Sequence, residues 1–399
     1  MTKTPQKIVV IGAGIGGLSA AIRLAAAGQE VTLIETQLYP GGKMRCLPSA
    51  AGPIDAGPTV LTLRTVFDDL FALVGERMDD HLTLRPHPML ARHWWPDGSR
   101  LDLFANADQS AEAIADFAGP RAAAEFRRFH RQTEDLFAAF DHPMLRSARP
   151  NLPGLVLNTL CAPSIWPALQ PGRSLARHLA ATFTDPRLRQ LFGRYATYVG
   201  GVPDLSPAVL ALIWQAEAKG VWSVQGGMHL LAQALANLAR RAGVSVSYGV
   251  SARKILKTAG RVSEVALSDG RSIKCDAVVF NGDPAALLAG LMGNGPQLAL
   301  APVAAHPRSL SAWVWSFAAI PSPIDLAHHN VFFGADPTLE FGAIAQGKMP
   351  TEATLYVCAQ DRTDAPLAPD SLERFEIIMN GPAKTKHSLQ EISECRAKT

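Results

Sequence analysis

The 399-residue sequence lacks several features that would assign it to a common class of protein. Its five cysteines are scattered and no two have C-x-x-C spacing, so neither a zinc site nor a disulfide framework is indicated. No uninterrupted apolar run reaches the roughly 18 residues that a membrane-spanning helix needs. There is also no block of lysine and arginine, and the net charge is only +3, so we expect no nucleic-acid partner.

Targeting signals and charge are also sparse. No apolar segment precedes the first predicted strand, so we expect no signal peptide. The scattered cysteines fit a reducing cytoplasm. Charged residues make up 18% of the chain and apolar residues 48%, as in a folded globular protein with a large core. Because the length exceeds the size at which one core usually keeps growing, we expect two domains.

The N-terminal segment has the pattern of a strand, a glycine turn and a helix. The β-branched run 8–11 stops at Gly12, and Gly14 and Gly17 follow at G-x-G-x-x-G spacing. The first glycine allows the turn, the second lets the backbone approach a pyrophosphate, and the third lets the helix pack on the strand. The free N–H groups at the start of such a helix favour a phosphate. The predicted cofactor contacts here are Gly12, Gly14, Ile15, Gly16 and Gly17.

A second strand, 31–34, ends at Glu35, where a carboxylate can accept hydrogen bonds from a ribose. Strand, turn, helix, strand and acid occur in this order, which predicts dinucleotide binding. The run GGKMR then follows, and the whole segment resembles the flavoprotein fingerprint of the amine oxidase and phytoene desaturase group, which implies FAD. An NAD site would not need this second glycine pair. The predicted contacts are Gly41, Gly42, Lys43 and Arg45.

Further along the chain, periodicity and turn residues predict the remaining elements. They are an amphipathic helix at 63–74, a hairpin at 92–104, helix at 110–140 and, after Met228, from Leu230 to Gly243, strands at 244–248, 262–267 and 277–280, and a later sheet at 311–320, 356–359 and 375–379. The stretch 142–184 has no acidic residue and contains six prolines. It is either a surface that docks at a bilayer interface or a proline-rich linker, and both interpretations stay open.

The motifs taken together resemble the bacterial phytoene desaturase family of carotenoid enzymes over residues 8–379. They are GGKMR, DAGPT, FGRYATYVGG, GVWSVQGGM and AVVFNGDP. Within that family, the runs around DAGPT, RYATYVGG and VWSVQGGM most resemble the hydroxyneurosporene (1-hydroxycarotenoid 3,4-) desaturases of purple photosynthetic bacteria. This resemblance implies an FAD-dependent oxidoreductase that introduces a C=C bond at the end of an acyclic hydroxycarotenoid. A hydride would pass to the flavin and a neighbouring proton would then leave.

The resemblance also implies an α/β fold, in which a Rossmann-like FAD-binding domain of the amine oxidase and phytoene desaturase type carries an inserted mixed α+β substrate domain. We expect the FAD-binding domain at 1–75 and 215–284. The substrate domain is expected at 76–214, with a helical and possible membrane-facing part, and at 285–399 as a sheet. We expect a peripheral place on the inner, photosynthetic membrane, facing the cytoplasm. The electron acceptor stays open, since oxygen, quinone or another carrier would leave the same fingerprint.

Site residues follow from the matching motifs. Asp55 either accepts the departing proton or orients the turn in which it lies. We expect no metal ligands. By family position, the further cofactor contacts are Gly57, Pro58, Thr59, Val250 and Asp283. The candidates for the substrate end are Arg194 and Tyr198, together with Trp313 and Trp315, which line either a sheet core or an apolar tunnel.

One departure from the family concerns residues 284–399. Family members end with a second glycine-rich flavin segment, and no such segment occurs here, so the sequence is interpreted as C-terminally truncated. Whether this chain folds and is active is then open. The alternatives to the principal hypothesis are a phytoene desaturase, another amine-oxidase-type flavoprotein, and a non-catalytic prenyl-chain-binding relative.

Overall fold

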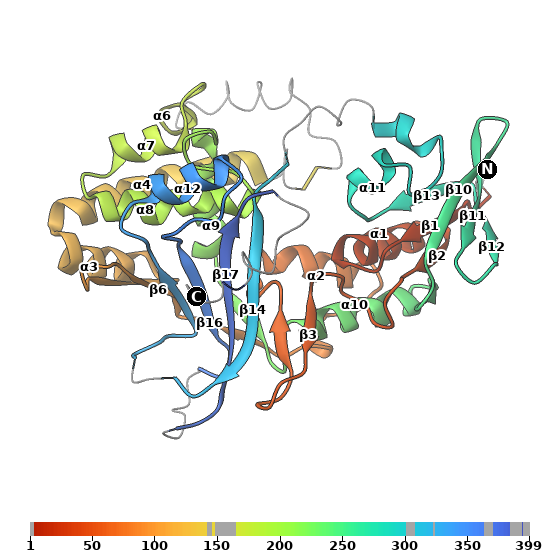
Figure 1. Cartoon of the computed structure of the whole chain (residues 1–399), viewed down its shortest axis with the longest axis horizontal. Helices are drawn as coiled ribbons and strands as arrows, with labels where there is room; N and C mark the ends of the chain where they lie inside the picture. Colours follow the sequence, from red (N-terminus) through yellow and green to blue (C-terminus); the bar gives the residue numbers. More distant parts are fainter. Residues whose placement is uncertain are drawn as a thin grey trace. The chain divides into compact units, whose positions relative to one another are not determined.

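The computed structural model describes residues 4–141, 146–147, 165–300, 308–321, 324–362, 370–383 and 393 (Figure 1). The chain forms two compact units, each assembled from separate segments. Unit 1 comprises Met1–Pro48, Asp55–Arg85 and Trp222–Pro307. Unit 2 comprises Ser49–Ile54, Pro86–Val221 and Arg308–Thr399.

A parallel sheet in the order β13-β1-β2-β9 forms the centre of unit 1. Its strands are β1 (Lys7–Ile11), β2 (Glu30–Ile34), β9 (Ser245–Ser247) and β13 (Ala277–Phe280). Helices α1 (Ile15–Ala26) and α10 (His229–Arg241) share one apolar core with β1 and β2. Because Val9 and Val10 point to opposite faces of β1 and both are buried, the sheet is covered on both sides.

An antiparallel meander covers the second face of this sheet. It consists of β10 (Ala252–Thr258), β11 (Arg261–Leu267) and β12 (Ser272–Lys274), and Val265 and Leu267 pack there with Val9 and Ile34. The other elements of unit 1 are β3 (Arg45–Leu47), α2 (Arg64–Ala72), η1 (Met78–Asp80), β8 (Trp222–Val224), α11 (Pro284–Leu288) and η6 (Pro296–Leu300). Strands β4 (Ile54–Ala56) and β5 (Leu84–Pro86) cross the boundary between the segments of the two units.

Unit 2 is built on a six-stranded mixed sheet in the order β14-β17-β16-β15-β6-β7. Strands β6 and β15 pair in parallel, and the other neighbours pair antiparallel. The strands are β6 (Met89–Trp94), β7 (Arg100–Phe104), β14 (Ser311–Ala319), β15 (His329–Phe332), β16 (Leu355–Ala359) and β17 (Glu373–Gly381). The predicted hairpin at 92–104 is therefore the β6–β7 edge of a larger sheet.

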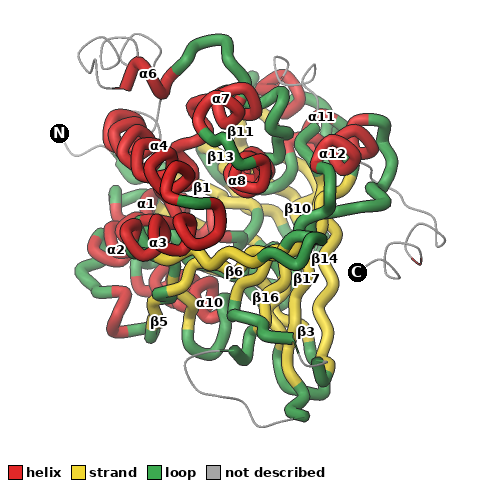
Figure 2. The backbone as a smooth tube through the Cα atoms, turned by 90° about the vertical axis from the view of Figure 1, so that its left-hand side faces the viewer, coloured by secondary structure: helices red, strands yellow, loops and turns green. Residues whose placement is uncertain are grey.

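Helices form the second layer of unit 2. Figures 1 and 2 show α3, α4, α7 and α8 gathered together beside the strands of the six-stranded sheet. The helices are α3 (Ala107–Ala118), α4 (Pro120–Phe140), α6 (Trp166–Leu169), α7 (Leu175–Thr182), α8 (Pro186–Gly193), η4 (Arg194–Val199), η5 (Ala208–Ile213), α9 (Trp214–Ala218) and α12 (Pro337–Ala345). The pattern predicted over 110–140 is two helices, because Gly119 adopts φ +88° and Pro120 begins a new helix.

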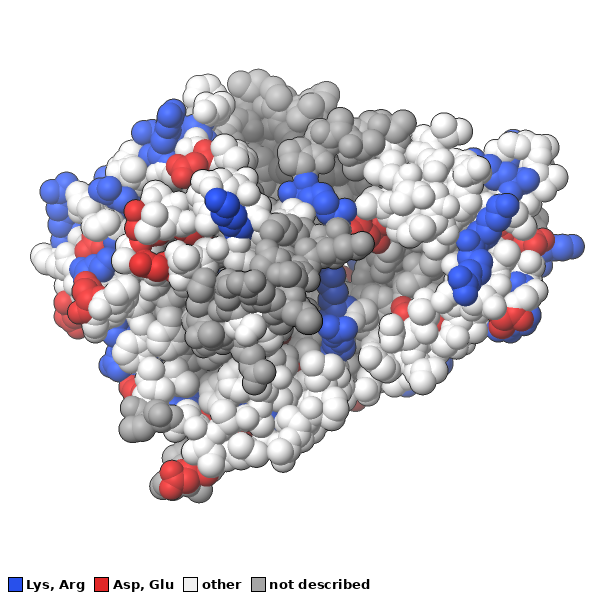
Figure 3. Space-filling model, in the orientation of Figure 1, with Lys and Arg blue, Asp and Glu red and all other residues white. Residues whose placement is uncertain are grey.

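The surface of the described residues is mixed in charge. On the face drawn in Figure 3, Lys and Arg side chains alternate with Asp and Glu among many uncharged residues. No helix among the described residues has both the length and the hydropathy that crossing a bilayer requires. About half of the proline-rich stretch, at 142–145 and 148–164, lies outside the described residues.

Candidate functional site

The glycine turn after β1 packs against α1 as closely as backbone permits. Gly12 adopts φ +102°, and its N–H donates to the Ile34 carbonyl at 2.8 Å. A Cβ on Gly17 would lie 1.9 Å from the Gly12 carbonyl oxygen, so only glycine allows α1 to start here. The glycines of the motif therefore allow α1 to begin directly beside β1, at the carboxyl end of the sheet.

The first turn of α1 has amides available for an anion. Its N-cap is Gly14, which has no side chain to accept from them, and the turn contains no acidic residue. Gly41 donates to the Ala13 carbonyl at 2.9 Å, and a Cβ on Gly42 would lie 3.2 Å from Gly14 Cα. The turn 12–17 and the pair Gly41 and Gly42 thus meet around a space that a side chain would fill, and we call this arrangement the glycine cradle. Its backbone amides and open space fit the pyrophosphate of a dinucleotide.

Glu35 is held at the end of β2, as predicted. Its Oε2 accepts from the Ala13 N–H at 2.7 Å and its Oε1 accepts from the Gln37 N–H at 2.8 Å, and the residue is 8% exposed. An ionised carboxylate has further lone pairs on both oxygens, so it can also accept from ribose hydroxyls. The Val250 N–H donates to the Glu35 carbonyl at 3.0 Å, so Val250 lies beside Glu35 at the end of β2. Lys43 and Arg45 are exposed on the segment after Gly42.

Asn281 is a further candidate for the site, and it was not among the residues predicted from the sequence. It follows β13, and its amide nitrogen lies 3.2 Å from where a Cβ of Gly14 would be. A polar residue at the carboxyl end of a strand adjacent to β1 was the available signal. Asp283, two residues on, accepts from the Ala285 N–H at 2.9 Å and caps α11.

The DAGPT turn packs within unit 1 against the segment that contains GGKMR. Gly57 has φ +131°, and a Cβ there would lie 2.0 Å from the Lys43 carbonyl oxygen. Asp55 accepts from the Met228 N–H at 2.6 Å, and its Oδ1 lies 3.1 Å from His229 Nδ1, at the start of α10. Both carboxylate oxygens of Asp55 are therefore engaged with the end of a helix. Pro58 is exposed in this turn and Thr59 is buried.

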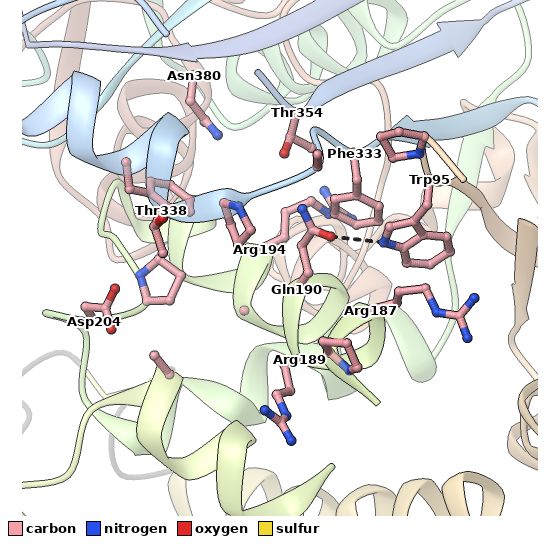
Figure 4. Close-up of a pocket in the computed structure, with 18 of the residues that line it drawn as sticks. Trp95, Arg187, Arg189, Gln190, Arg194, Asp204, Phe333, Thr338, Thr354 and Asn380 are labelled. Atoms are coloured by element: carbon pink, nitrogen blue, oxygen red, sulfur yellow. Dashed lines mark hydrogen bonds between the residues drawn. The ribbon is translucent and has the colours of Figure 1, made fainter. Parts of the chain in front are cut away.

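Unit 2 contains a cavity of 660 Å³ (Figure 4). Its apolar lining includes Trp95, Phe333 and Phe341. The Trp95 indole N–H donates to Gln190 Oε1 at 3.0 Å, and the Gln190 amide donates to the Gly334 carbonyl at 2.8 Å. These bonds leave a rigid wall with aromatic faces and a few fixed polar groups, which is the usual composition of a small-molecule site.

Three arginines reach this cavity, and two of them are committed to the protein. Arg187 pairs with Asp185 at 2.8 Å, and Arg189 donates from Nε to the Phe183 carbonyl at 2.7 Å. Arg194 differs, because its Nε is buried without a hydrogen-bond partner among the described residues. Of these three lining cations, Arg194 therefore keeps a buried donor for a bound group.

Arg194 belongs to a polar cluster around Glu217. Tyr195 donates its hydroxyl to Glu217 Oε2 at 2.6 Å, and Tyr198 donates to Oε1. The Arg194 guanidinium carbon lies 5.5 Å from each tyrosine ring centroid. Burial and the adjacent Glu217 carboxylate raise the pKa of Tyr195 well above its ordinary value, so its hydroxyl stays a donor. Glu217, from the segment just before the VWSVQGGM run, was not predicted.

The other predicted substrate residues are placed differently. Tyr198 does not line the cavity; it contacts Arg194, which does, and Glu217, and it is 48% exposed. Trp313 and Trp315 lie on β14 with ring centroids 6.2 Å apart, and neither lines the cavity. The structure therefore brings Arg194 and Tyr198 together and leaves the two tryptophans on a sheet edge.

Comparison with known proteins agrees with this geometry. The family model for flavin-containing amine oxidoreductases matches residues 15–310. The chain is 58% identical over 399 residues to the hydroxyneurosporene desaturase of Cereibacter sphaeroides and 54% identical over 397 residues to that of Rhodobacter capsulatus, covering 100% of this chain and 80% of each relative. It is 34% identical to the phytoene dehydrogenase of Streptomyces griseus, covering 91% of this chain and 70% of that protein.

A solved oxidoreductase from Methanosarcina mazei has the same fold, with a TM-score of 0.61 at 17% identity over 98% of this chain and 82% of that one. The predicted α/β flavoprotein fold, the FAD cofactor and the apolar carotenoid substrate are thereby confirmed. The chain belongs to the carotenoid desaturases, FAD-dependent oxidoreductases of the flavin-containing amine oxidoreductase family.

Proposed function

We propose that this protein introduces a C=C bond at the end of an acyclic hydroxycarotenoid such as hydroxyneurosporene. The observation that best supports this proposal is the sequence identity over the whole of this chain. It is 58% and 54% to two desaturases of that name, compared with 34% to a phytoene dehydrogenase over 91% of this chain. We assign FAD binding to unit 1, in which the glycine cradle and Glu35 lie, and the polyene to unit 2. We still predict that the FAD-binding and substrate-binding parts of the chain change over near residues 75, 214 and 284.

Bound FAD supplies an acceptor for the hydride that leaves the saturated end of the polyene. The chain's own residues position the reactants and exclude water, since the remaining charge is stabilised along the conjugated chain rather than by a nucleophile. In this proposal the cofactor is held by the residues predicted from the sequence, with Asn281 added. The aromatic walls of the unit 2 cavity receive the isoprenoid end of the substrate.

Arg194 supports the choice of a hydroxylated end group. Its unpartnered Nε is the kind of buried donor that a substrate hydroxyl satisfies, whereas a plain hydrocarbon leaves it unsatisfied. We expect Arg194→Met to lower kcat/KM for hydroxyneurosporene about 10- to 100-fold, the effect of losing a hydrogen bond to a charged group, with little change for neurosporene. Arg177→Met, an exposed arginine of the same unit, is the matched control.

The direct test is to incubate the FAD-loaded protein with hydroxyneurosporene, neurosporene, phytoene and a primary amine. Lengthening the conjugated system shifts the pigment absorption to the red, and we expect the largest rate with hydroxyneurosporene. Faster turnover of phytoene would replace this proposal with phytoene desaturation. Turnover of the amine alone, or a colourless protein that takes up no flavin, would overturn it.

The role of Asp55 separates into two testable cases. The contacts to α10 support a positioning role, in which Asp55 holds the DAGPT turn in place. We expect Asp55→Asn to retain kcat within about tenfold, because the one amide oxygen still accepts from the Met228 N–H, although the bonds at the second oxygen are lost. A loss of a hundredfold or more at unchanged stability would instead identify Asp55 as the group that accepts the proton.

Membrane association is part of the same proposal, because a long polyene partitions into lipid. Leu205 is 85% exposed and Trp166 53% exposed in unit 2, and the carbonyl of the exposed Arg173 accepts from the Ala208 N–H, close in the chain to Leu205. Exposed apolar side chains beside arginine favour a peripheral contact with the cytoplasmic leaflet. Leu205→Ser should reduce cosedimentation with anionic vesicles, and Leu291→Ser, an exposed leucine of unit 1, is the control.

A further inference from the structure

Three histidines of unit 2 meet at the edge of the six-stranded sheet, outside the cavity described above. His87 lies just before β6, and His328 and His329 lie at the start of β15, which pairs with β6 in parallel. One ring nitrogen from each lies within 4.8 Å of the others. The ring centroids are 4.5 to 5.0 Å apart.

The hydrogen bond of His328 fixes which of its ring nitrogens is available, and that of His329 engages one nitrogen and leaves the other. His328 Nδ1 lies 3.0 Å from the Arg362 carbonyl oxygen, and because a carbonyl only accepts, Nδ1 must carry the proton. His328 Nε2 therefore has a lone pair. His329 Nδ1 lies 2.8 Å from the Tyr356 hydroxyl, and its Nε2 is buried without a hydrogen-bond partner among the described residues. This buried nitrogen keeps a hydrogen-bonding or ligating capacity that the described residues do not use, and it belongs to the ring that meets two other histidines.

Burial keeps two of the three rings, those of His328 and His329, neutral. Burial, together with the proximity of His87, lowers the pKa of His328 to about 4. Burial also lowers the pKa of His329 well below its ordinary value, and His328, His87 and Arg194 add to this effect. Neutral imidazoles are the form that binds metal ions, so no proton has to be displaced near neutral pH.

We propose that His87, His328 and His329 bind a divalent transition-metal ion of the zinc class. Zinc–nitrogen bonds of about 2.1 Å place tetrahedral ligand atoms about 3.4 Å apart, so small rotations of the rings draw them together around the ion. The Arg362 carbonyl and the Tyr356 hydroxyl already hold the outer nitrogens, as the second shell of a metal site does. Cys358 Sγ, 3.7 Å from His328 Nε2, adds a soft donor beside the site.

Such an ion would tie the segment before β6 to the start of β15. His87 is distant in the chain from the adjacent pair His328 and His329, and the ion would cross-link the two segments through side chains in addition to the backbone pairing of Asn330 with Arg92. None of the three histidines belongs to the glycine cradle or lines the unit 2 cavity, so Zn²⁺ binding can be measured on the protein without substrate.

The test uses the full chain purified without a polyhistidine tag, loaded with FAD and freed of metal by chelation. We expect calorimetric titration with Zn²⁺ to show one ion per chain, and Co²⁺ to give the ligand-field bands of a tetrahedral site against the cobalt-free flavoprotein. His329→Gln should weaken Zn²⁺ binding more than tenfold, and Tyr356→Phe, which removes only the outer partner, by about 10- to 100-fold. His81→Gln, in unit 1, should bind as the unchanged protein does.

Circular dichroism of each variant checks that it folds, and the Tyr356→Phe protein retains all three ligands in case His329→Gln does not fold. A rise in thermal stability with added Zn²⁺ in the unchanged protein, absent in His329→Gln, would support the site by mass action. Absence of stoichiometric binding to the unchanged protein, or equal Zn²⁺ affinity in the unchanged, His329→Gln and Tyr356→Phe proteins, would overturn it.

Discussion

Glu35 illustrates at the scale of one residue how the fold prepares a binding group. Two backbone N–H donors, from Ala13 and Gln37, hold its oxygens at the end of β2 before any ligand arrives. The residue is nearly buried, so little side-chain entropy remains to be lost when a ribose binds. The same bonds join the carboxylate to the glycine turn, which couples ribose recognition to the phosphate cradle.

We expect Glu35→Gln to weaken FAD binding about 10- to 100-fold, since hydrogen bonds to a charged group are worth about 1.5–3 kcal/mol. The amide also has only one acceptor oxygen for the two backbone donors. Titration of apoprotein with FAD, followed by flavin fluorescence, measures the change. Glu30→Gln, on the exposed end of the same strand, is the control, and equal affinity in the two variants would contradict the role of Glu35.

His93 makes stability depend on pH. It is 1% exposed on β6, and burial, followed by the charge of Arg194, lowers its pKa to about 3. Below its ordinary pKa near 6.5 the unfolded chain binds a proton that the folded chain does not, so stability falls as the pH drops from about 6.5 toward about 3. Near pH 4.5 this costs about 2–3 kcal/mol relative to pH 7.5.

His93→Gln should therefore lose less stability on acidification than the unchanged protein, by about 2 kcal/mol between these pH values. Urea unfolding at each pH measures the difference. His81→Gln, a partly exposed histidine paired with Glu76, serves as the comparison. An identical pH slope in the His93 variant would show that His93 is protonated in the folded state.

At the scale of elements, α1 depends on how closely it approaches β1. The turn from Gly12 to Gly17 leaves no room for a methyl group at Gly17, and the first helical turn has neither an acidic residue nor a side-chain cap, as the proposed cofactor site requires. The predicted strand, turn and helix at 8–28 correspond to β1 and α1, because spacing and φ > 0 requirements are local properties of the chain. By contrast, β15 and α12 were not predicted, since short mixed segments carry no clear period.

Gly17→Ala should destabilise unit 1 by about 1–3 kcal/mol or more, because its Cβ would collide with the Gly12 carbonyl. Gly342→Ala, on α12, is the matched control: nothing lies within 4 Å of its Cβ, and we expect a gain of about 0.5–1 kcal/mol. Thermal unfolding of both variants checks this. Equal stability of the two would mean that α1 shifts away from β1 at little cost.

At the scale of the whole molecule, the chain builds two units from alternating segments. A ligand that binds only the folded state stabilises it by mass action, about 2.7 kcal/mol at a hundredfold excess over Kd. We expect FAD at that excess to raise the unfolding temperature of unit 1 in a calorimetric scan, and to raise it less in Glu35→Ala. Unfolding that is unchanged by FAD would show that the native cradle does not bind the cofactor.

The sequence by itself determined the cofactor and the enzyme family. Glycine spacing, an acid at a strand end and motifs such as DAGPT and GGKMR are local patterns, so they can be recognised from the sequence alone. Tertiary structure alone decided which side chains meet: Asn281 at the glycine turn, Glu217 between two tyrosines, and His87 beside His328 and His329. These partners are far apart in the chain, and their proximity follows from sheet pairing and packing, which no local pattern encodes.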